Sequence, residues 1–277
     1  MRFSYKIAII FIFSATTSII SQEKLKGNKV VTIEDRNISD FTKIEVIDDI
    51  NIFLVYNDNQ SVTVEADSNL QPVILTEVKG GILTIRTSEV IGRSKELNVH
   101  LKINKNITNI NAYNNASINS NNSLIIDNLT INAFDTSDFS LKLNSKNLTI
   151  NGKTSSKFNF EILSTDVTIK TESSSELKAT INTQNIALEI SDKSLITLIG
   201  NSNDLSLESY SSASFKGKGF ITKNATIQAN NDTNISINAS ETLNVSLNNT
   251  SELNVYSNPA IIIKEFNDKA LLRKKEL

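Results

Sequence analysis

A short pattern recurs seven times between Leu129 and Val255, and it strongly limits how this chain can fold. Each copy opens on an apolar pair at positions 0 and 2, continues through Ser, Thr, Asn and Asp, and returns to an apolar residue near position 10. The copies open at Leu129, Leu148, Val167, Ile186, Leu205, Ala225 and Leu243, with successive spacings of 19, 19, 19, 19, 20 and 18 residues. A constant period of this length is typical of a solenoid, in which each repeat is one coil stacked on the previous coil. The repeat therefore predicts an all-β parallel β-helix of about 19 residues per coil.

Alternation within a coil predicts which side chains face the interior. Leu129 and Ile131 point the same way because side chains alternate along a strand, and Phe139 resumes the inward set at position 10. Position 8 is always Ser, Thr or Ala, which favours a tight corner where the interior narrows. We interpret this column as a structural corner, although a polar binding column is the alternative. A degenerate first coil is expected to begin at Thr108.

The segment before the coils follows a different pattern. From Ile38 to about Ile103, apolar residues alternate at period two, which predicts half-buried strands. Turn residues such as Asp48-Asp49 and Gly80-Gly81 separate these strands. We therefore expect a strand-rich N-terminal part that precedes the array.

The first residues predict export. Arg2 and Lys6 precede the apolar run Ile7 to Phe13, and polar sequence begins at Ser21, as in a secretory signal cleaved after that residue. The alternative, a retained anchor, is disfavoured because the run is shorter than the roughly 20 residues that span a bilayer. The net charge of −2 gives no reason to expect nucleic acid or an anionic membrane as a partner.

The sequence offers little for catalysis or metal binding. With one histidine, His100, and no cysteine, the chain cannot form a histidine-rich or thiolate metal cluster. No nucleophile motif accompanies His100, so we predict no catalytic, cofactor-binding or metal-ligating residue. Calcium could use oxygen ligands at Asp48-Asp49, Asn57 to Asn59 or Asn201 to Asp204, but these segments match no calcium loop and favour turns.

Two patterns would suit a carbohydrate ligand. A carbohydrate-active enzyme needs paired carboxylates, and Asp135, Asp192 and Asp232 fall at or near one corner of the predicted coils. Sugar recognition without catalysis uses exposed aromatic rings, for which Tyr113, Tyr210 and Tyr256 are the candidates. By contrast, Phe139, Phe158 and Phe215 occupy the inward column and are predicted to be core.

The N-terminal half resembles a known family. The features are Phe41 to Val46, the Asp48-Asp49-Ile50 turn, Val62 to Asp67, the Gly80-Gly81 turn and the ending Tyr256 to Phe266. They resemble the head GIN domain of the auto-transporter adhesin family of exported Bacteroidetes-type proteins. The resemblance implies a right-handed parallel β-helix with strand-rich ends. It brings no catalytic residues, and the chain has no C-terminal segment typical of an auto-transporter barrel.

Together these observations predict the domain organisation. We expect a signal peptide at 1–21, a polar leader at 22–36, a head GIN-like β domain at 37–266 and a charged tail at 267–277. Within that domain, residues 37–107 would form the N-terminal strands, 108–256 the coils and 257–266 a terminal strand.

The functional hypothesis is a non-enzymatic adhesion or binding module of the cell envelope. It would be exported to the periplasm, the outer-membrane surface or the medium, with no transmembrane anchor after cleavage of the signal. Its partner would be a glycan or protein of the surface or envelope. The alternatives are a polysaccharide lyase or hydrolase on the same scaffold and a purely structural envelope protein.

Overall fold

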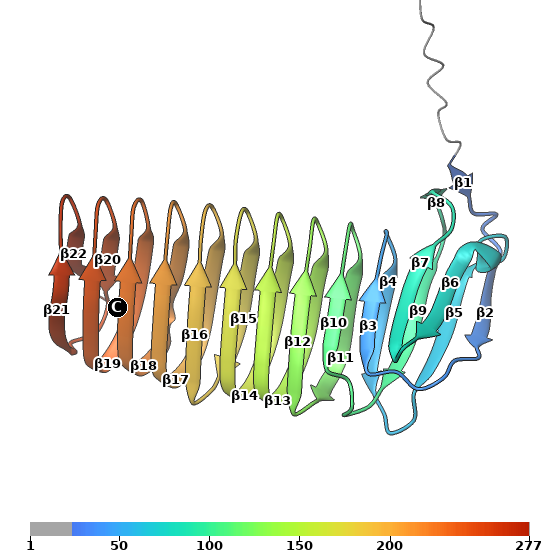
Figure 1. Cartoon of the computed structure of the whole chain (residues 1–277), viewed down its shortest axis with the longest axis horizontal. Helices are drawn as coiled ribbons and strands as arrows, with labels where there is room; N and C mark the ends of the chain where they lie inside the picture. The colour runs from blue at the N-terminus through green and yellow to red at the C-terminus, as the bar shows by residue number, and fades with distance from the viewer. Residues whose placement is uncertain (1–23, 277) are drawn as a thin grey trace, which may run out of the picture.

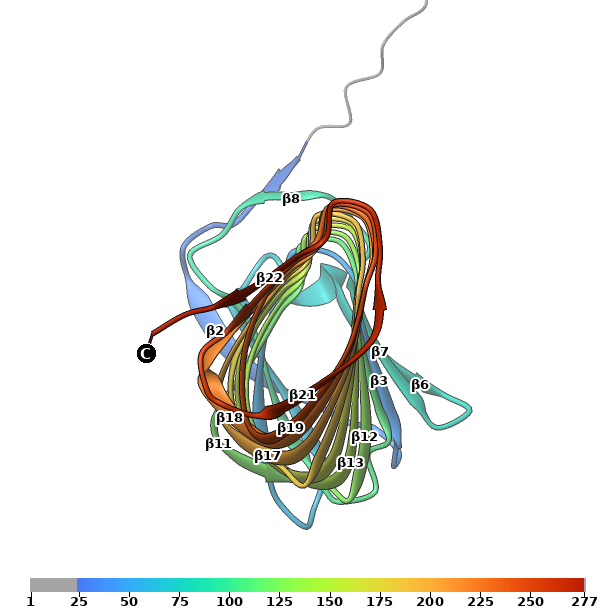
Figure 2. The same cartoon turned by 90° about the vertical axis from the view of Figure 1, so that its left-hand side faces the viewer.

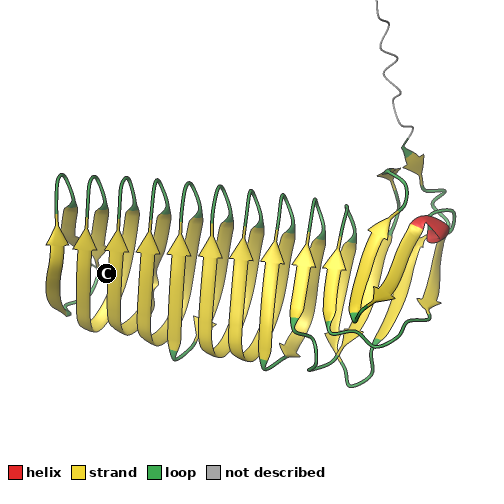
Figure 3. Ribbon diagram, in the orientation of Figure 1, coloured by secondary structure: helices red, strands yellow, loops and turns green. Residues whose placement is uncertain are grey.

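The computed structural model of the chain describes residues 24–276 and is 67% strand (Figure 1). The expected signal peptide lies outside the described residues. The strands wind into a β-solenoid of about 9 turns at roughly 19 residues per coil, drawn in yellow in Figure 3. The strands of the near sheet run upward, the corners carry the chain to the far sheet, and the chain advances in a right-handed sense (Figure 1). The all-β parallel β-helix is therefore confirmed, including the winding that the resemblance implied.

Successive coils pair in parallel and, over most of each strand, position by position. The strands of the array are β10 Asn109–Ala112, β11 Ser117–Ile125, β12 Asn128–Ala133, β13 Asp138–Gly152, β14 Lys157–Thr171, β15 Glu176–Asn182, β16 Asn185–Ile190, β17 Leu195–Ser209, β18 Ser214–Ala229, β19 Asn234–Leu247 and β20 Glu252–Val255. Ile131 pairs with Ile150, and Ile150 pairs with Ile169. All three side chains are fully buried, so the predicted inward column exists.

The interior is filled by like residues stacked on like. Phe139 and Phe158 lie in adjacent coils with ring centroids 5.7 Å apart, and both are buried. Leu129, Leu148 and Val167 form a second continuous column. A narrow interior filled this way needs few large rings, which accounts for a chain with no Trp and only 6% aromatic residues.

One corner of every coil has the same turn. A non-glycine residue with positive φ occupies it in turn after turn: Asp48, Asn114, Asp135, Thr154, Ser173, Asp192, Ser211, Asn231, Asn249 and Asp268. Two residues later comes a buried side chain, which is Ile50 after Asp48 and Ala, Ser or Thr at the other corners. The Ser137 hydroxyl donates to the Phe134 carbonyl at 2.7 Å, and the Ser194 hydroxyl donates to the Ser191 carbonyl at 2.6 Å. The position 8 column also bonds between coils, since the Ser156 hydroxyl donates to Ser175 at 3.1 Å and the Thr171 hydroxyl donates to Ser194 at 3.2 Å, so it is a structural corner.

The coils begin earlier than the repeat predicts. Strands β3 Lys43–Val46 and β4 Asn51–Tyr56 pair in parallel with β10 and β11, and Asp48 makes the usual corner between them. The first coil in chain order is therefore formed by residues 43–56, and the coil expected to start the array at Thr108 is stacked upon it. The expectation failed because 66 residues separate the paired positions Lys43 and Asn109, which breaks the period.

The remaining N-terminal strands close this end of the solenoid. Strands β7 Ile82–Thr87 and β9 Leu97–Ile103 pair in parallel with the other edges of β3 and β4. Strands β5 Ser61–Asp67 and β6 Ile74–Lys79 then add antiparallel to β9 and β7. The short 3₁₀ helix η1 Gln71–Val73, red in Figure 3, joins β5 to β6.

Both expected tails take part in the structure. Within the expected polar leader, β2 Val31–Arg36 pairs antiparallel with β5, and β1 Leu25–Lys26 pairs with β8 Ile91–Arg93 in a flap outside the coils (Figure 2). At the other end, β21 Ala260–Phe266 and β22 Leu271–Lys274 form one more coil on β19 and β20. The segment expected as a charged tail thus supplies a strand of the last coil.

Asp67 holds the flap to the coils. Its side chain is fully buried and accepts hydrogen bonds from the backbone N–H groups of Lys29, Lys95 and Glu96, the latter two at 2.6 and 3.3 Å. Burial acts to raise the pKa of this carboxyl, but the backbone donors and the nearby Lys95 charge outweigh burial and hold the pKa below its ordinary value. Gly27 must lack a side chain, because a Cβ atom there would lie 2.6 Å from the carboxylate carbon.

Candidate functional site

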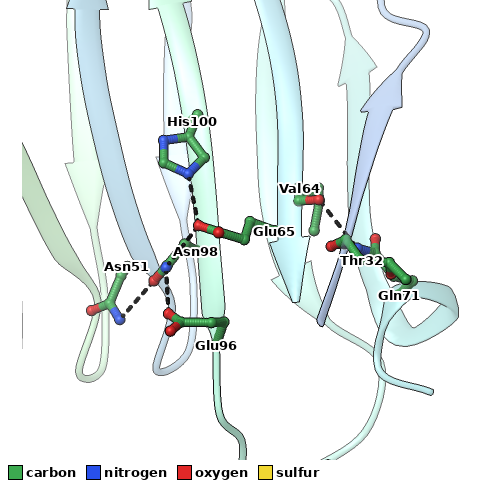
Figure 4. A network of polar contacts seen from close by, with 8 residues as sticks. All are labelled: Thr32, Asn51, Val64, Glu65, Gln71, Glu96, Asn98 and His100. Atoms are coloured by element: carbon green, nitrogen blue, oxygen red, sulfur yellow. Dashed lines mark hydrogen bonds and ion pairs between the residues drawn. The ribbon is translucent and has the colours of Figure 1, made fainter. Parts of the chain in front are cut away.

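His100 belongs to a small polar cluster on the outer surface of β4, β5 and β9 (Figure 4). Its Nε2 lies 3.1 Å from Glu65 Oε2, and its ring stacks on Phe53 at a centroid distance of 5.3 Å. Asn98 Nδ2 donates to Glu65 at 3.2 Å and to Glu96 at 2.8 Å. The hydrogen bonds from His100 and Asn98 lower the pKa of Glu65, so this carboxylate is charged near neutral pH and is poorly suited to donate a proton.

The three corner carboxylates do not form a close pair. Asp135 accepts a hydrogen bond from the N–H of Asn114 at 3.1 Å, and Asp192 accepts one from the N–H of Ser173 at 3.1 Å. Both carboxylates therefore stabilise corner turns of the preceding coil. Asp135 lies three coils from Asp192, and Asp232 two coils further on, which at about 4.8 Å per coil gives roughly 14 and 10 Å. Glycoside hydrolysis uses carboxyl groups about 5–9.5 Å apart. The spacing between Asp135 and Asp192 exceeds this range, and the spacing between Asp192 and Asp232 falls at its upper end.

The calcium candidates also serve turns. Asp48 accepts the N–H and the hydroxyl of Thr87, both at 3.1 Å, and Asn57 accepts the N–H of Asn59 at 3.0 Å. Asp204 accepts the Asn224 amide of the next coil at 3.0 Å. Within residues 24–276, no three His, Asp or Glu side chains are grouped so that they could hold a metal ion.

The three candidate tyrosines are half-buried and each has a partner. Tyr113 stacks on Phe134 with centroids 4.8 Å apart and an interplanar angle of 2°. The Tyr210 hydroxyl donates to Glu208 at 2.9 Å, and this bond raises the pKa of the phenol. Lys218 Nζ lies 5.0 Å from the centre of the Tyr256 ring. Sequence reasoning missed Phe134, because it sorted phenylalanines into the inward column and this ring lies at position 5, outside it.

A regular surface of the molecule is the outer side of one sheet. We call it the ladder face and define it by β10, β12, β16 and the second halves of β13, β14, β17, β18 and β19. Amide side chains form ladders along it, with Asn132 donating to Asn111 at 2.7 Å and Asn151 donating to Asn132 at 2.8 Å.

A second ladder runs along the lower edge of the same face. Asn147 donates to Asn128, and Asn185 donates to Asp166, both at 2.7 Å. Between the two ladders, position 1 carries mostly Thr or smaller residues: Thr130, Thr149, Thr168, Ala187, Ser206 and Thr226. Over the central coils this low column and the lower ladder line a shallow hollow of about 420 Å³. The ladder face is thus flat, polar and regularly spaced.

The fold defines the class of protein as a right-handed parallel β-solenoid with an antiparallel N-terminal cap. The family model described as "Putative auto-transporter adhesin, head GIN domain" matches residues 40–162 and again residues 149–259. The two matches together span most of the chain, and the chain belongs to this family.

Solved structures share the fold at low sequence identity. A "putative adhesin" from Parabacteroides merdae is 18% identical with a TM-score of 0.65, covering 91% of this chain and 99% of the other. A second "putative adhesin", from Parabacteroides distasonis, is 17% identical with a TM-score of 0.66, covering 91% and 100%. A "putative lipid binding protein" from the same species is 16% identical with a TM-score of 0.61, covering 92% and 100%. No curated protein matches the chain in sequence.

The family model and these solved structures are named for adhesion or binding. In the part of the chain that the structure describes, no helix is long and apolar enough to cross a membrane.

Proposed function

We propose that this protein is an exported, non-enzymatic binding module of the cell envelope that adheres to its partner through the ladder face. The observation that carries the proposal is the regular polar surface formed by successive coils. Each coil adds one set of outward amides and hydroxyls about 4.8 Å from the last. A partner with a repeating surface could form many weak hydrogen bonds on such a lattice, and their sum could be a useful affinity.

Two further observations support a binding rather than a catalytic role. The family and its structural relatives are named for adhesion or binding. Asp135 and Asp192, which were singled out in the sequence, accept N–H groups of the corner turns, and His100 is hydrogen-bonded to Glu65 at the surface. Export is supported by the N-terminal basic and apolar pattern and by the family of exported proteins that the chain resembles.

The test is a binding assay with matched charge changes on the two sheets. The double variant Thr149→Lys with Thr168→Lys places two long cations on the ladder face, and we expect it to weaken saturable binding of the labelled protein to intact cells or isolated envelopes. The control is Ser140→Lys with Asn159→Lys, which places the same charges on the same strands, β13 and β14, but in the opposite sheet.

Loss of binding in the ladder-face variant alone supports the proposal. If both variants bind equally well, the contact lies on another surface. If the wild-type protein does not bind at all, the proposed adhesive function is wrong. Protease treatment of intact cells then locates the protein, since degradation indicates exposure at the surface and protection indicates the periplasm.

A further inference from the structure

Strand β21, the last strand of the sheet that carries the ladder face, has an unpaired edge. Among the described residues, β21 pairs only with β19, and β22 in the other sheet pairs only with β20. Beyond β22 the described chain runs outward, away from the rim of the coil, so it does not cover this end of the rod (Figure 2). The backbone N–H and C=O groups along the outer edge of β21 are therefore open to another strand.

The isoleucines of β21 are apolar on both faces of the strand. Ile261 and Ile263 take the register of buried residues in β19, and they are 44% and 52% exposed because no further coil covers them within the described residues. Ile262 takes the outward register, where the preceding coils carry Thr, Ala, Ser or Asn, and it is 53% exposed. An inward position accounts for the first two isoleucines but not for Ile262.

The N-terminal end of the rod is protected against strand addition. Its edge strands are β2 and β6, and each carries an ion pair along the strand. In β2, Glu34 is paired in register with the buried Val64, so its charge lies on the inner side of the sheet. Inward-pointing charges at an edge discourage pairing with another chain. The three isoleucines of β21 place no such charge at the other end.

The backbone of β21 directs the groups of its inward residues at the open edge. Thr130, which lies in the same column as Ile262, donates its N–H to the Thr108 carbonyl of the preceding coil at 2.9 Å. The backbone groups of successive residues in a strand point to opposite edges. The N–H and C=O groups of Ile262 are thus directed at β19, and those of Ile261 and Ile263 are directed away from it.

We propose that two copies of this protein join at their C-terminal ends as a symmetric dimer, in which β21 pairs antiparallel with β21 of the second copy about a twofold axis at Ile262. Ile261 then exchanges both backbone hydrogen bonds with Ile263 of the second copy. The two Ile262 residues face each other in a pair without hydrogen bonds, with Cα atoms about 4.5 Å apart. The inward isoleucines pack across the junction, and the outward ones cover each other. This inference does not depend on the proposed function.

A second copy is the occupant that the sequence of β21 itself fits. Three consecutive isoleucines read the same in both directions, so a twofold axis places each of them against another isoleucine. Head-to-tail pairing would instead join this edge to β2 or β6 of the next copy, where the charges oppose strand addition. A twofold contact uses the same patch on both copies and closes at the dimer. The two ladder faces lie on one side of the joined sheet and form a continuous surface.

The charges at this end are compatible with the pairing. In the proposed register Lys264 comes opposite an alanine of the second copy, so it faces no like charge within the sheet. In the other sheet, Arg273 pairs with Glu252 at 2.5 Å, and Lys274 Nζ donates to a backbone carbonyl of the preceding turn at 2.6 Å. Both cations of β22 are thus held by their own chain and are not directed across the open edge.

The first test measures the mass of the protein, expressed from its full sequence and purified, by analytical ultracentrifugation at micromolar concentrations. We expect a dimer. Ile262→Lys should raise the dissociation constant about tenfold or more, which corresponds to about 1.4 kcal/mol, because two ammonium groups would meet at the twofold axis. The matched control is Ile199→Lys, which changes a similarly exposed isoleucine of β17, 55% exposed and away from this end, and should leave the dimer intact.

A single thiol tests the register directly. The chain has no cysteine, so Ile262→Cys can form a disulfide only between two copies. A Cα separation of about 4.5 Å lies within the range of about 4.4–6.8 Å that a disulfide spans. Mild oxidation should therefore convert this variant into covalent dimers, whereas Ile199→Cys at the same concentration should remain largely uncrosslinked.

Each result decides the matter. A monomeric wild-type protein overturns the proposal and leaves the edge to a strand of another protein, and an assembly larger than a dimer overturns the twofold closure. A dimer that Ile262→Lys does not weaken overturns the pairing at β21. The same holds if Ile262→Cys gives no more covalent dimer than Ile199→Cys, a comparison that remains decisive if circular dichroism shows that Ile262→Lys has lost strand content.

Discussion

Thr154 is the least suitable residue in the corner column. It adopts φ of 66°, as its Asp, Asn and Ser counterparts do, but a β-branched side chain is disfavoured in this conformation. Asn tolerates it better, and Asn already occupies the column at three other coils. We expect Thr154→Asn to raise the free energy of unfolding by about 0.5–1 kcal/mol. Denaturant unfolding measures this, and Ser155→Asn, one residue outside the column, should give no gain; a loss at Thr154→Asn would contradict the account.

Asp67 makes the N-terminal end sensitive to acid. Its folded-state pKa lies below the unfolded value of about 3.9, so the stabilisation is complete above that value and is lost as pH falls through the folded pKa. We expect Asp67→Asn to cost about 1–3 kcal/mol at neutral pH, because one or more backbone N–H groups lose a buried acceptor. Thermal midpoints measured from pH 7 down to pH 2 should converge for the two proteins. A difference that persists undiminished at pH 2 would contradict the role of the carboxylate.

The residues of the candidate sites show what sequence reasoning can and cannot reach. Tyr113 was singled out from the sequence, but its partner Phe134 was not. Sequence periodicity does not tell whether an aromatic ring beside a corner points inward or outward. The left-handed conformation of Thr154 was equally hidden, since neither Thr nor Ser is a usual signal for positive φ. Such features depend on where the backbone turns and cannot be read from side-chain periodicity.

At the scale of elements, the sequence predicts those strands whose partners lie one period away. Strands β13 and β14 pair position by position across 19 residues, so the repeat alone defines their register. Strands β3 and β4 obey the same inward alternation, but their partners β10 and β11 come 66 residues later. Alternation thus predicted them as strands, while their membership in the solenoid depends on contacts that no local pattern encodes.

The apolar residues of the last strands at the C-terminal end are also explained by their register in the coils. Ile261 and Ile263 take the register of the buried residues Leu243 and Val245, yet they are 44% and 52% exposed. Within the described residues, no further coil covers them. Their apolar character reflects an inward position in the last described coil, whereas Ile262 between them takes the outward register of Asn244.

At the scale of the whole molecule, the described ends of the chain lie at opposite ends of the rod, and the hydrogen bonds between coils run along its length (Figure 1). Tension applied through those ends would therefore load one rung at a time, beginning with β22 and β21, instead of shearing many rungs together. Each detached coil would release about 60 Å of extended chain. Single-molecule stretching should therefore record a regular sawtooth of force against extension. A single large rupture would contradict this, whereas the stepwise release would let a tether dissipate mechanical load while the remaining turns stay wound.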